Sequence, residues 1–396
     1  MTLILVINCG SSSLKFSLFD KEELRISGIL ECIGEGTPEL VLGRGVEEER
    51  RAVVAEDHAE AMQRVHEFLI EVCGDVGAVE AIGHRIVHGG ERFFTAELVT
   101  PVVEEGIEAC AALAPLHNLA HLAGIRAARA YFPELPQVVV FDTAFHQTMP
   151  ERAFLYALPY ALYEEEGIRR YGFHGTSHKY VSQRAAELLQ RETFTGITCH
   201  LGNGSSLAAI REGRSVDTTM GLTPLEGVAM GTRSGDIDPT VVFHLARRRG
   251  MEIEQIERLL NQESGLLGLS GRSKDMRSIE AAAIEGDKRA QLALEVFTYR
   301  VRKYIGAYMA VLGRIDAMVF TGGIGENSPA TRRRILQDME GLGLQLDSVR
   351  NRAHVGQEGE ISIFGSQVKI LVVPTNEELV IARETLEVIQ TSQERS

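Results

Sequence analysis

Short apolar runs alternate with longer amphipathic segments along the chain. Six apolar runs predict buried strands at residues 3–7, 14–19, 137–141, 197–201, 317–321 and 369–373. Three longer segments predict helices at residues 59–73, 289–312 and 376–389, the first of which carries a regular apolar face. This alternation predicts an α/β architecture. Residues 31–56 are rich in Gly and Glu and predict an exposed edge region.

Composition and charge narrow the class of protein. The 396 residues are 44% hydrophobic and 24% charged, a length that predicts two or three domains. The net charge of −14 argues against a nucleic-acid partner, because phosphate-backbone binding needs clustered Lys and Arg. No run approaches the about 18 apolar residues of a membrane span. The five dispersed cysteines form no CxxC motif, and we expect free thiols in a reducing, cytoplasmic environment.

Two similar Gly/Ser turns lie far apart in the chain. Residues 8–14 and residues 201–207 each join two strand-like runs through small residues. Such residues let backbone N–H groups approach an anion, and serine hydroxyls add donors. Each turn alone could be an ordinary hairpin. Together they predict a duplicated fold that holds a phosphate-bearing ligand between its halves.

A third Gly-rich segment follows the predicted strand at 317–321. The sequence contains no Gly-Lys pair, so a P-loop is excluded. Residues 323–328 instead predict a turn, after which Asn327 or Ser328 caps a helix with Pro329 at its first position. A helix N-terminus after a buried strand suits a nucleotide phosphate. A plain strand-to-helix turn is the alternative.

Two arginines occupy Gly-rich, weakly charged surroundings. Arg85 and Arg233 are therefore candidates for binding an anion, since a guanidinium matches carboxylate and phosphate geometry. For Arg233 the alternative is a structural ion pair with Asp236 or Asp238. Asp142 ends an apolar run, where open α/β sheets bind ligands, although it could also cap a turn.

Histidines cluster in one part of the chain. Eight of the twelve lie within residues 84–200. The pairs His117/His121 and His174/His178 have helical spacing, but neither carries the HExxH glutamate or a clear third ligand, which disfavours zinc. The alternative is that these histidines form hydrogen bonds in a polar cleft.

Nine motifs, in order along nearly the whole chain, resemble those of the acetate kinase family. They are VINCGSSSLKFSLFD (6–20), GHRIVHGGE (83–91), APLHN (114–118), VFDTAFHQTMP (140–150), YGFHGTSHKYV (171–181), CHLGNGSS (199–206), MGTRSGDIDP (230–239), TGGIGENS (321–328) and PTNEELVIARET (374–385). An ordered set of this size is far more specific than any single Gly-rich turn.

The resemblance implies an actin-like ATPase (ribonuclease H-like) fold, with two duplicated α/β domains around a central cleft. We expect residues 1–147 with 379–396 to form the N-terminal domain, and residues 148–378 the C-terminal domain with the nucleotide site. The implied reaction is reversible phosphoryl transfer between ATP and acetate, giving ADP and acetyl phosphate. The implied cofactor is Mg²⁺, for which Mn²⁺ can substitute, and the implied assembly is a homodimer. Propionate kinase, of the same family, is the alternative.

The resemblance also implies roles for individual residues. Asn8 and Glu377 would hold Mg²⁺, and Lys15 would reach the nucleotide phosphates. Arg85 and Arg233 would flank the acyl phosphate, and His174 would stabilise the transferring phosphoryl group. The implied ATP-binding residues are Lys15, His200, Leu201, Gly202, Asn203, Gly204, Asp275, Met276, Arg277, Gly323, Ile324, Gly325, Glu326 and Asn327. The implied pocket for the acetate methyl group consists of Val87, Leu116, Phe173 and Pro224.

The chemistry implied by the resemblance needs little proton transfer. A carboxylate with a pKa of about 4–5 is already ionised at neutral pH and needs no general base. We therefore expect direct in-line attack, with charge stabilised by cations. Asp142 is expected to be a catalytic residue that orients Mg²⁺ through water. Gly322 stands where the family commonly has Ala, a departure that we expect to matter little.

Overall fold

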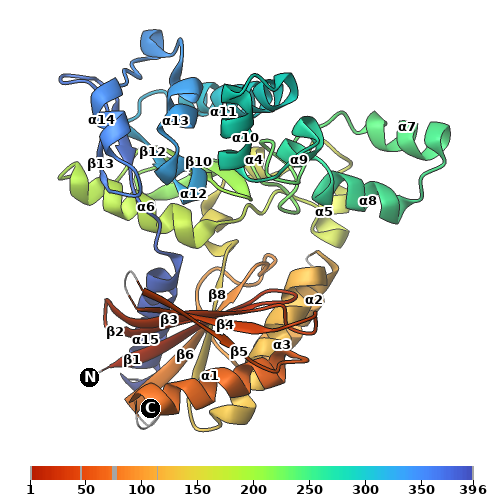
Figure 1. Cartoon of the computed structure of the whole chain (residues 1–396), viewed down its shortest axis with the longest axis vertical. Coiled ribbons are helices and arrows are strands. Elements are labelled where there is room, and N and C mark those ends of the chain that lie inside the picture. The colour runs from red at the N-terminus through yellow and green to blue at the C-terminus, as the bar shows by residue number, and fades with distance from the viewer. Residues whose placement is uncertain (1, 45–46, 74–77, 114, 395–396) are drawn as a thin grey trace. The chain divides into compact units, whose positions relative to one another are not determined.

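The computed structural model describes residues 2–44, 47–73, 78–113 and 115–394. The chain forms two compact units (Figure 1). Met1–Ala144 and Asn376–Ser396 form the first unit, and Phe145–Thr375 forms the second. From the sequence we expect divisions after residues 147 and 378; the compact units divide after residues 144 and 375.

The first unit is built on an eight-stranded sheet with the order β5-β4-β3-β2-β1-β6-β8-β7. Strands β1 to β5 form an antiparallel meander, β6 and β8 extend it in parallel with β1, and β7 pairs antiparallel with β8. The strands are β1 (Leu3–Cys9), β2 (Leu14–Asp20), β3 (Glu23–Glu31), β4 (Glu39–Arg44), β5 (Glu47–Ala52), β6 (Val79–Ile86), β7 (Glu97–Leu98) and β8 (Gln137–Phe141).

Helices cover both faces of this sheet. They are α1 (His58–Cys73), α2 (Pro101–Ala109), α3 (Pro115–Tyr131) and α15 (Glu377–Glu394). One face of β1 packs with α1 and α3 in a single apolar core, because alternate side chains of a strand point to the same side. Helix α15 packs against β6, where an added Cβ on Gly83 would lie 2.3 Å from Thr385 Oγ1. Glycine at this position therefore permits the close approach of α15.

The second unit is built on a six-stranded sheet with the order β11-β10-β9-β12-β14-β13. Strands β9, β10 and β11 are antiparallel, whereas β12 and β14 run parallel to β9. The strands are β9 (Gly196–Leu201), β10 (Ser205–Arg211), β11 (Arg214–Thr218), β12 (Ala317–Thr321), β13 (Gly359–Glu360) and β14 (Lys369–Val372).

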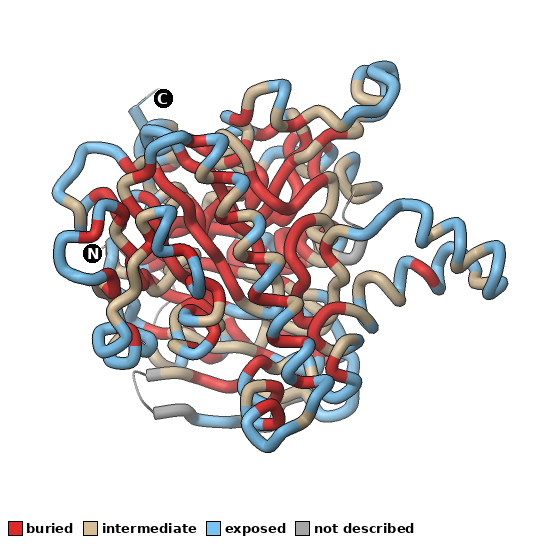
Figure 2. The backbone as a smooth tube through the Cα atoms, turned by 90° about the horizontal axis from the view of Figure 1, so that it is seen from above, coloured by how far each residue is buried: buried red, intermediate tan, exposed pale blue. Residues whose placement is uncertain are grey.

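The second unit has helices on both faces of its sheet and others that extend away from it (Figure 1). They are α4 (Glu151–Phe154), α5 (Ala161–Glu166), α6 (Gly175–Leu188), α7 (Thr240–Arg249), α8 (Ile253–Gln262), α9 (Gly265–Ser270), α10 (Met276–Ile284), α11 (Lys288–Leu312), α12 (Gly322–Asn327), α13 (Pro329–Leu336) and α14 (Ser348–Ala353). Helix α11 contributes Phe297, Val301 and Ile305 to the larger core. Helix α6 packs on the other face through Val181 and Ala185. The buried residues, red in Figure 2, follow the strands of both units.

The two sheets share one strand order. In each unit, an antiparallel three-stranded meander is extended by two parallel strands, in the order β3-β2-β1-β6-β8 in the first and β11-β10-β9-β12-β14 in the second. The expected fold class, a duplicated actin-like α/β architecture, is thereby confirmed, as are the two strand-turn-strand repeats. The region expected to be an exposed edge contributes β5 at the sheet edge, but β4 lies one strand further in and buries Leu40, Val41 and Leu42, so the expectation is only partly confirmed. The Gly- and Glu-rich composition concealed both strands. In the described part of the chain, no helix combines the length and apolar character that crossing a membrane requires.

Candidate active site

In the first unit, polar residues gather at the carboxyl ends of three neighbouring parallel strands. The register pairs Ile7 of β1 with His84 of β6, so Asn8 and Arg85 follow at the same edge of the sheet. Asp142 directly follows β8, and Lys15 of β2 lies opposite Asn8. This edge is where open α/β sheets bind ligands.

Arg85 and Asp142 form a two-pronged ion pair. Arg85 Nε donates to Asp142 Oδ1 at 3.0 Å, and Arg85 Nη2 donates to Asp142 Oδ2 at 2.7 Å. The Asp142 side chain is 1% exposed. Burial alone would lower the pKa of Arg85, but the carboxylates of Asp142, Glu377 and Glu378 raise it overall. The Asp142 carboxylate thus fixes the plane of the Arg85 guanidinium.

Glu377 opens α15 beside this ion pair. Its neighbour Glu378 accepts a hydrogen bond from Ser17 Oγ at 3.0 Å. Asn8 and Glu377 supply amide and carboxylate oxygens, the donor type that Mg²⁺ prefers. Among the described residues no group of three His, Cys, Asp or Glu side chains could hold a metal by itself. The residues fit an Mg²⁺ ion that completes its shell with phosphate oxygens and water, as nucleotide-bound Mg²⁺ does.

The expected methyl pocket falls partly in the first unit. Val87 is 7% exposed and lies two residues beyond Arg85. Its backbone N–H donates to His121 Nδ1 at 3.3 Å. Burial, and then the charge of Arg85, lowers the pKa of His121 to about 3, so this imidazole is neutral. Leu116 belongs to α3, but its side chain lies outside the described residues.

In the second unit, histidines and hydroxyls form a connected polar network. His174 is the N-cap residue of α6 in a left-handed conformation, with φ of 56°. Its Nδ1 lies 2.9 Å from Ser206 Oγ, and His178 Nε2 lies 2.8 Å from the same hydroxyl. The His174 ring stacks on the His200 ring with 4.2 Å between centroids. Ser206 and His200 therefore hold His174 from two directions.

The network continues to the end of the second unit. His200 Nδ1 is hydrogen-bonded to Ser177 Oγ at 2.7 Å, and Thr375 Oγ1 donates to that hydroxyl at 2.8 Å. Burial lowers the pKa of His178 well below its usual value, so this residue stays neutral. These contacts agree with the alternative to a zinc site, in which the histidines form hydrogen bonds.

Arg233 has different surroundings from Arg85. Its Nη1 donates to Pro224 O at 3.2 Å and lies 3.9 Å from Met230 Sδ. The expected alternative of an ion pair is wrong, because Asp236 instead accepts from Tyr304 and Asp238 from Thr240. Among the described residues, no carboxylate forms an ion pair with Arg233, and burial lowers its pKa.

Gly204 lies between Arg233 and His174. A Cβ added to it would be 3.3 Å from His174 Nε2 and 3.6 Å from Arg233 Nη1. The Gly/Ser turn thus brings the His174 imidazole close to the same backbone position as the Arg233 guanidinium, which has no carboxylate partner in the described part of the chain. That combination can bind a phosphoryl group through both charge and hydrogen bonds.

The other Gly-rich segment is a short helix, not the expected turn. Helix α12 begins at Gly322, and Ser328 then caps α13 by accepting from Thr331 N, with Pro329 at the first position as expected. A Cβ on Gly202 would lie 3.9 Å from Gly323 N, so the two Gly-rich segments adjoin. Gly322 has a φ of 75°, and its Cβ would lie 2.8 Å from Leu201 O. A side chain at Gly322 is therefore strained in this backbone, and the expectation that the departure from the family's common Ala matters little stays a prediction.

Other residues expected at the nucleotide make local contacts. Glu326 Oε1 accepts hydrogen bonds from Gly322 N at 2.7 Å and from Thr375 N at 3.0 Å. Asp275 caps α10 and pairs with Arg277 at 2.7 Å. The remaining expected residues are placed as follows: Met276 and Phe173 are buried, Leu201 ends β9, Ile324 and Gly325 lie in α12, Asn203 is exposed, Pro224 is half-buried, and Asn327 Nδ2 donates to Gly323 O at 3.0 Å.

The sequence matches the Acetokinase family over residues 3–383. The chain belongs to this family. The acetate kinase of Shewanella loihica is 52% identical over 397 residues, covering 98% of this chain and 99% of that protein. The acetate kinase of Thermotoga petrophila is 50% identical over 399 residues, covering 98% of both.

Two solved structures of the family resemble the whole chain. The acetate kinase of Porphyromonas gingivalis has a TM-score of 0.93 at 43% identity, and the propionate kinase of Francisella tularensis has a TM-score of 0.94 at 44% identity. Each comparison covers 98% of this chain and 100% of the other. The resemblance expected from the motifs, and the fold that it implies, are confirmed.

Sequence reasoning missed several residues that surround the family's expected groups. Ser206, Ser177 and Thr375 connect the histidines, and Glu378 lies beside Arg85. Ser206 lies inside a quoted motif, so its turn marked it as a donor without naming its partner. Thr375 also lies inside a quoted motif, at 374–385, but the motif does not name its partner, because Ser177 comes from a distant segment.

Proposed function

We propose that this acetokinase-family protein is an acetate kinase, which transfers a phosphoryl group reversibly between ATP and acetate to give ADP and acetyl phosphate. The environment of Arg233 is the observation that most directly supports the proposal. A partly buried guanidinium with no carboxylate partner among the described residues is costly unless an anion binds to it. A transferring phosphoryl group would supply that anion.

The residues of the second unit would bind the nucleotide and the transferring group. The turn around Gly202–Gly204 and the adjoining segment from Gly323 to Asn327 would bind the nucleotide phosphates, as Gly-rich turns and helix N-termini do. Lys15, from the first unit, would reach the nucleotide phosphates. Arg233 and His174 would stabilise the charge that spreads over the phosphoryl oxygens during transfer, which is where phosphoryl-transfer enzymes obtain most of their catalysis.

The residues of the first unit would bind acetate. Arg85, held in one plane by Asp142, would hold the acyl phosphate, and Val87 would contact the methyl group. Acetate is ionised at neutral pH, so the in-line attack requires no base. The two-pronged contact leads us to assign Asp142 the positioning of Arg85, in place of the water-mediated orientation of Mg²⁺ that we expect from the sequence.

The proposal also includes a bound metal ion and a dimer of this chain. Asn8 and Glu377 would hold Mg²⁺, which when bound would neutralise charge on the nucleotide phosphates. We further propose, from the family resemblance alone, that the protein is a cytoplasmic homodimer. Light scattering of the purified protein tests the dimer: a mass of one chain would contradict it.

The decisive experiment traps the product. Purified protein is incubated with ATP, Mg²⁺, acetate and hydroxylamine, and acetyl hydroxamate is measured. We expect hydroxamate that depends on acetate; ATP consumption that is equal with and without any short carboxylate would refute the proposal. The same assay with propionate tests the alternative, which the similarity to the Francisella tularensis propionate kinase keeps open. A higher kcat/KM for propionate would favour it.

Arg233→Ala tests the observation on which the proposal depends. The loss of one electrostatic donor to the transition state should lower kcat about 10²–10³-fold. Arg233→Lys should restore little, because an ammonium cannot make two parallel contacts. Normal turnover of a correctly folded Arg233→Ala variant would show that this arginine is only structural.

A further inference from the structure

A long loop carries Arg233. The segment 219–239, called here the Arg233 loop, joins β11 to α7. It folds back on itself, so that Asp236 N donates to Gly227 O at 2.8 Å. Gly235, with φ of 64°, lies where a Cβ would be 2.5 Å from the carbonyl oxygens of Gly227 and Val228. The loop therefore has a defined path, although most of it is neither helix nor strand.

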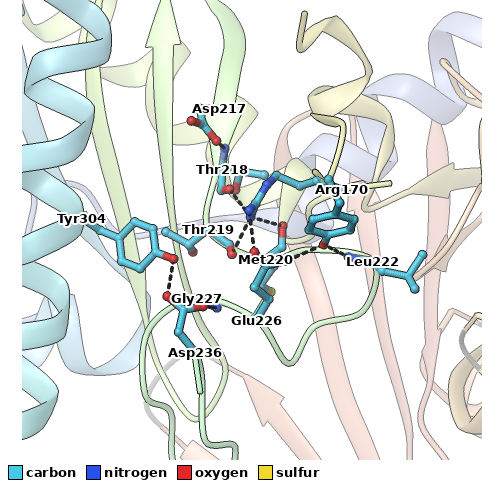
Figure 3. A network of polar contacts seen from close by, with 11 residues as sticks. Arg170, Asp217, Thr218, Thr219, Met220, Leu222, Glu226, Gly227, Asp236 and Tyr304 are labelled. Atoms are coloured by element: carbon cyan, nitrogen blue, oxygen red, sulfur yellow. Dashed lines mark hydrogen bonds and ion pairs between the residues drawn. The ribbon is translucent and has the colours of Figure 1, made fainter. Parts of the chain in front are cut away.

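One side of the Arg233 loop is held by Arg170. Its Nη1 donates to three successive carbonyls, those of Thr218 at 2.8 Å, Thr219 at 2.9 Å and Met220 at 3.4 Å. Its Nη2 donates to Glu226 Oε1 at 2.5 Å (Figure 3). A single guanidinium thus joins the beginning of the loop to its middle.

Tyr156 binds the other carboxylate oxygen of Glu226. The Tyr156 hydroxyl donates to Glu226 Oε2 at 2.5 Å and accepts from Leu222 N at 2.9 Å. Farther along, Asp236 accepts from Gly227 N at 2.8 Å and from Tyr304 at 2.6 Å. Both halves of the loop are therefore tied to side chains of the surrounding unit.

Arg170 also links the Arg233 loop to the segment that leads into His174. It lies four residues before His174, and the intervening Tyr171 N donates to Gly221 O at 3.0 Å. His174 has its own supports in Ser206 and His200. Among the described residues, the Arg233 guanidinium contacts only the loop itself, at Pro224 O and Met230 Sδ, whereas the backbone beside it is also bonded to Leu260 and Ser264.

We propose that Arg170 and Glu226 are positioning residues for Arg233, which fix the Arg233 loop so that the Pro224 carbonyl directs the guanidinium toward Gly204. The proposal rests on the phosphoryl-binding role of Arg233 in the proposed function. Arg170 and Glu226 touch no substrate in this role; they act through the loop.

The test is a double-mutant cycle between Arg170→Lys and Arg233→Ala. Lysine keeps the charge but cannot bond at once to three carbonyls and a carboxylate. ATP formation from acetyl phosphate and ADP is followed by luminescence, so that slow variants stay measurable. The matched control is Arg184→Lys, which disrupts another two-pronged ion pair of the same unit, with Glu358 at 2.6 and 2.8 Å, far from this loop in sequence.

We expect Arg170→Lys to lower kcat about 10–10²-fold in the otherwise unchanged protein, as a misplacement of about 1 Å does. In the Arg233→Ala background it should change kcat by no more than about twofold, since the group that it positions is gone. Arg184→Lys should leave kcat unchanged in both backgrounds. Circular dichroism and Tm are measured for every variant.

Two outcomes would overturn the proposal. If Arg170→Lys lowered kcat by the same factor with and without Arg233, Arg170 would act on the structure in general. If Arg170→Lys left kcat unchanged, the loop would not need Arg170. If Arg170→Lys does not fold, Glu226→Gln enters the same cycle with the same expectations. A failure of the proposed function is seen separately, as the absence of ATP formation by the unchanged protein.

Discussion

Replacing Asp142 by asparagine should lower kcat about 10–10²-fold without changing the shape of the pH–rate curve. The side chain is isosteric but uncharged, and only its oxygen can accept from Arg85. Its amide nitrogen would face a second donor, Nε or Nη2, so one of the two bonds at 3.0 and 2.7 Å is lost. The Arg85 guanidinium would then leave the plane that the carboxylate imposes.

The expected size follows from the lost contact. A hydrogen bond between charged groups contributes about 1.5–3 kcal/mol. Each 1.36 kcal/mol of transition-state stabilisation corresponds to about tenfold in rate, which gives about 10–10²-fold. Arg85→Ala, which removes the cation itself, should lose more, about 10²–10³-fold. Stability should fall less than at a lone buried charge, because Glu377 and Glu378 still compensate Arg85.

The assay is acetyl phosphate formation from pH 5 to 9, repeated over a range of Mg²⁺ concentrations. A positioning role predicts a uniform loss, with the Mg²⁺ concentration for half-maximal rate unchanged. The disappearance of one ionisation from the profile would assign Asp142 a proton transfer. A raised Mg²⁺ requirement with otherwise normal kcat would assign it the orientation of the metal. Either result would refute the reasoning from the ion pair.

Three further predictions concern specificity and stability. Val87→Ala should reduce the ratio of kcat/KM for acetate to that for propionate, which for one methylene normally corresponds to about 1–3 kcal/mol, whereas Val103→Ala, at an equally buried valine, should leave it unchanged. The same ratio in the Val87→Ala variant and the unchanged protein would exclude Val87 from the pocket. Gly322→Ala should lower the free energy of unfolding in urea by about 1–3 kcal/mol, because φ is 75°, whereas Gly323→Ala, with open space around its Cβ, should be tolerated; equal effects would contradict the strain. Burial lowers the pKa of His146 to about 4, below the unfolded value of about 6.5. Its contribution to the free energy of unfolding is therefore complete above pH 6.5 and is lost as the pH falls toward 4, and the loss amounts to about 2 kcal/mol at pH 5. Urea unfolding from pH 7.5 to 5 should show this loss, and a slope unchanged in His146→Asn would refute it.

The sequence predicted those strands that are short apolar runs, namely β1, β2, β8, β9, β12 and β14. The predicted strands 137–141 and 317–321 have the bounds of β8 and β12. It missed others, among them β4, β5 and β6, because Glu, Arg, Gly or His interrupt or replace their apolar residues. It also read α12 as a turn, because three glycines in six residues oppose helix formation in isolation.

Side-chain partners were harder to predict than elements. Asp142 was selected from its position after a strand, but its partner depends on the register between β6 and β8, which pairs Arg85 with Val140. Local sequence does not determine that register. The alternative of an ion pair between Arg233 and Asp236 does not form, because Asp236 accepts hydrogen bonds from Tyr304, which is distant in sequence, and from Gly227 N.

The two arginines chosen for the same reason differ most in their charge environment. Arg85 faces Asp142, Glu377 and Glu378, so its charge is compensated before any substrate arrives. Among the described residues, Arg233 has carbonyl and thioether contacts only, and burial opposes its charge. Because Asp142 holds the Arg85 guanidinium in one plane and the nearby carboxylates already offset its charge, we propose that Arg85 contributes orientation of the small carboxylate more than net positive charge. An anion that approaches Arg233 supplies compensation that the described residues do not, which suits the charge of a phosphoryl group. We propose that this difference in neighbours, and not the arginines themselves, divides acceptor orientation from charge stabilisation.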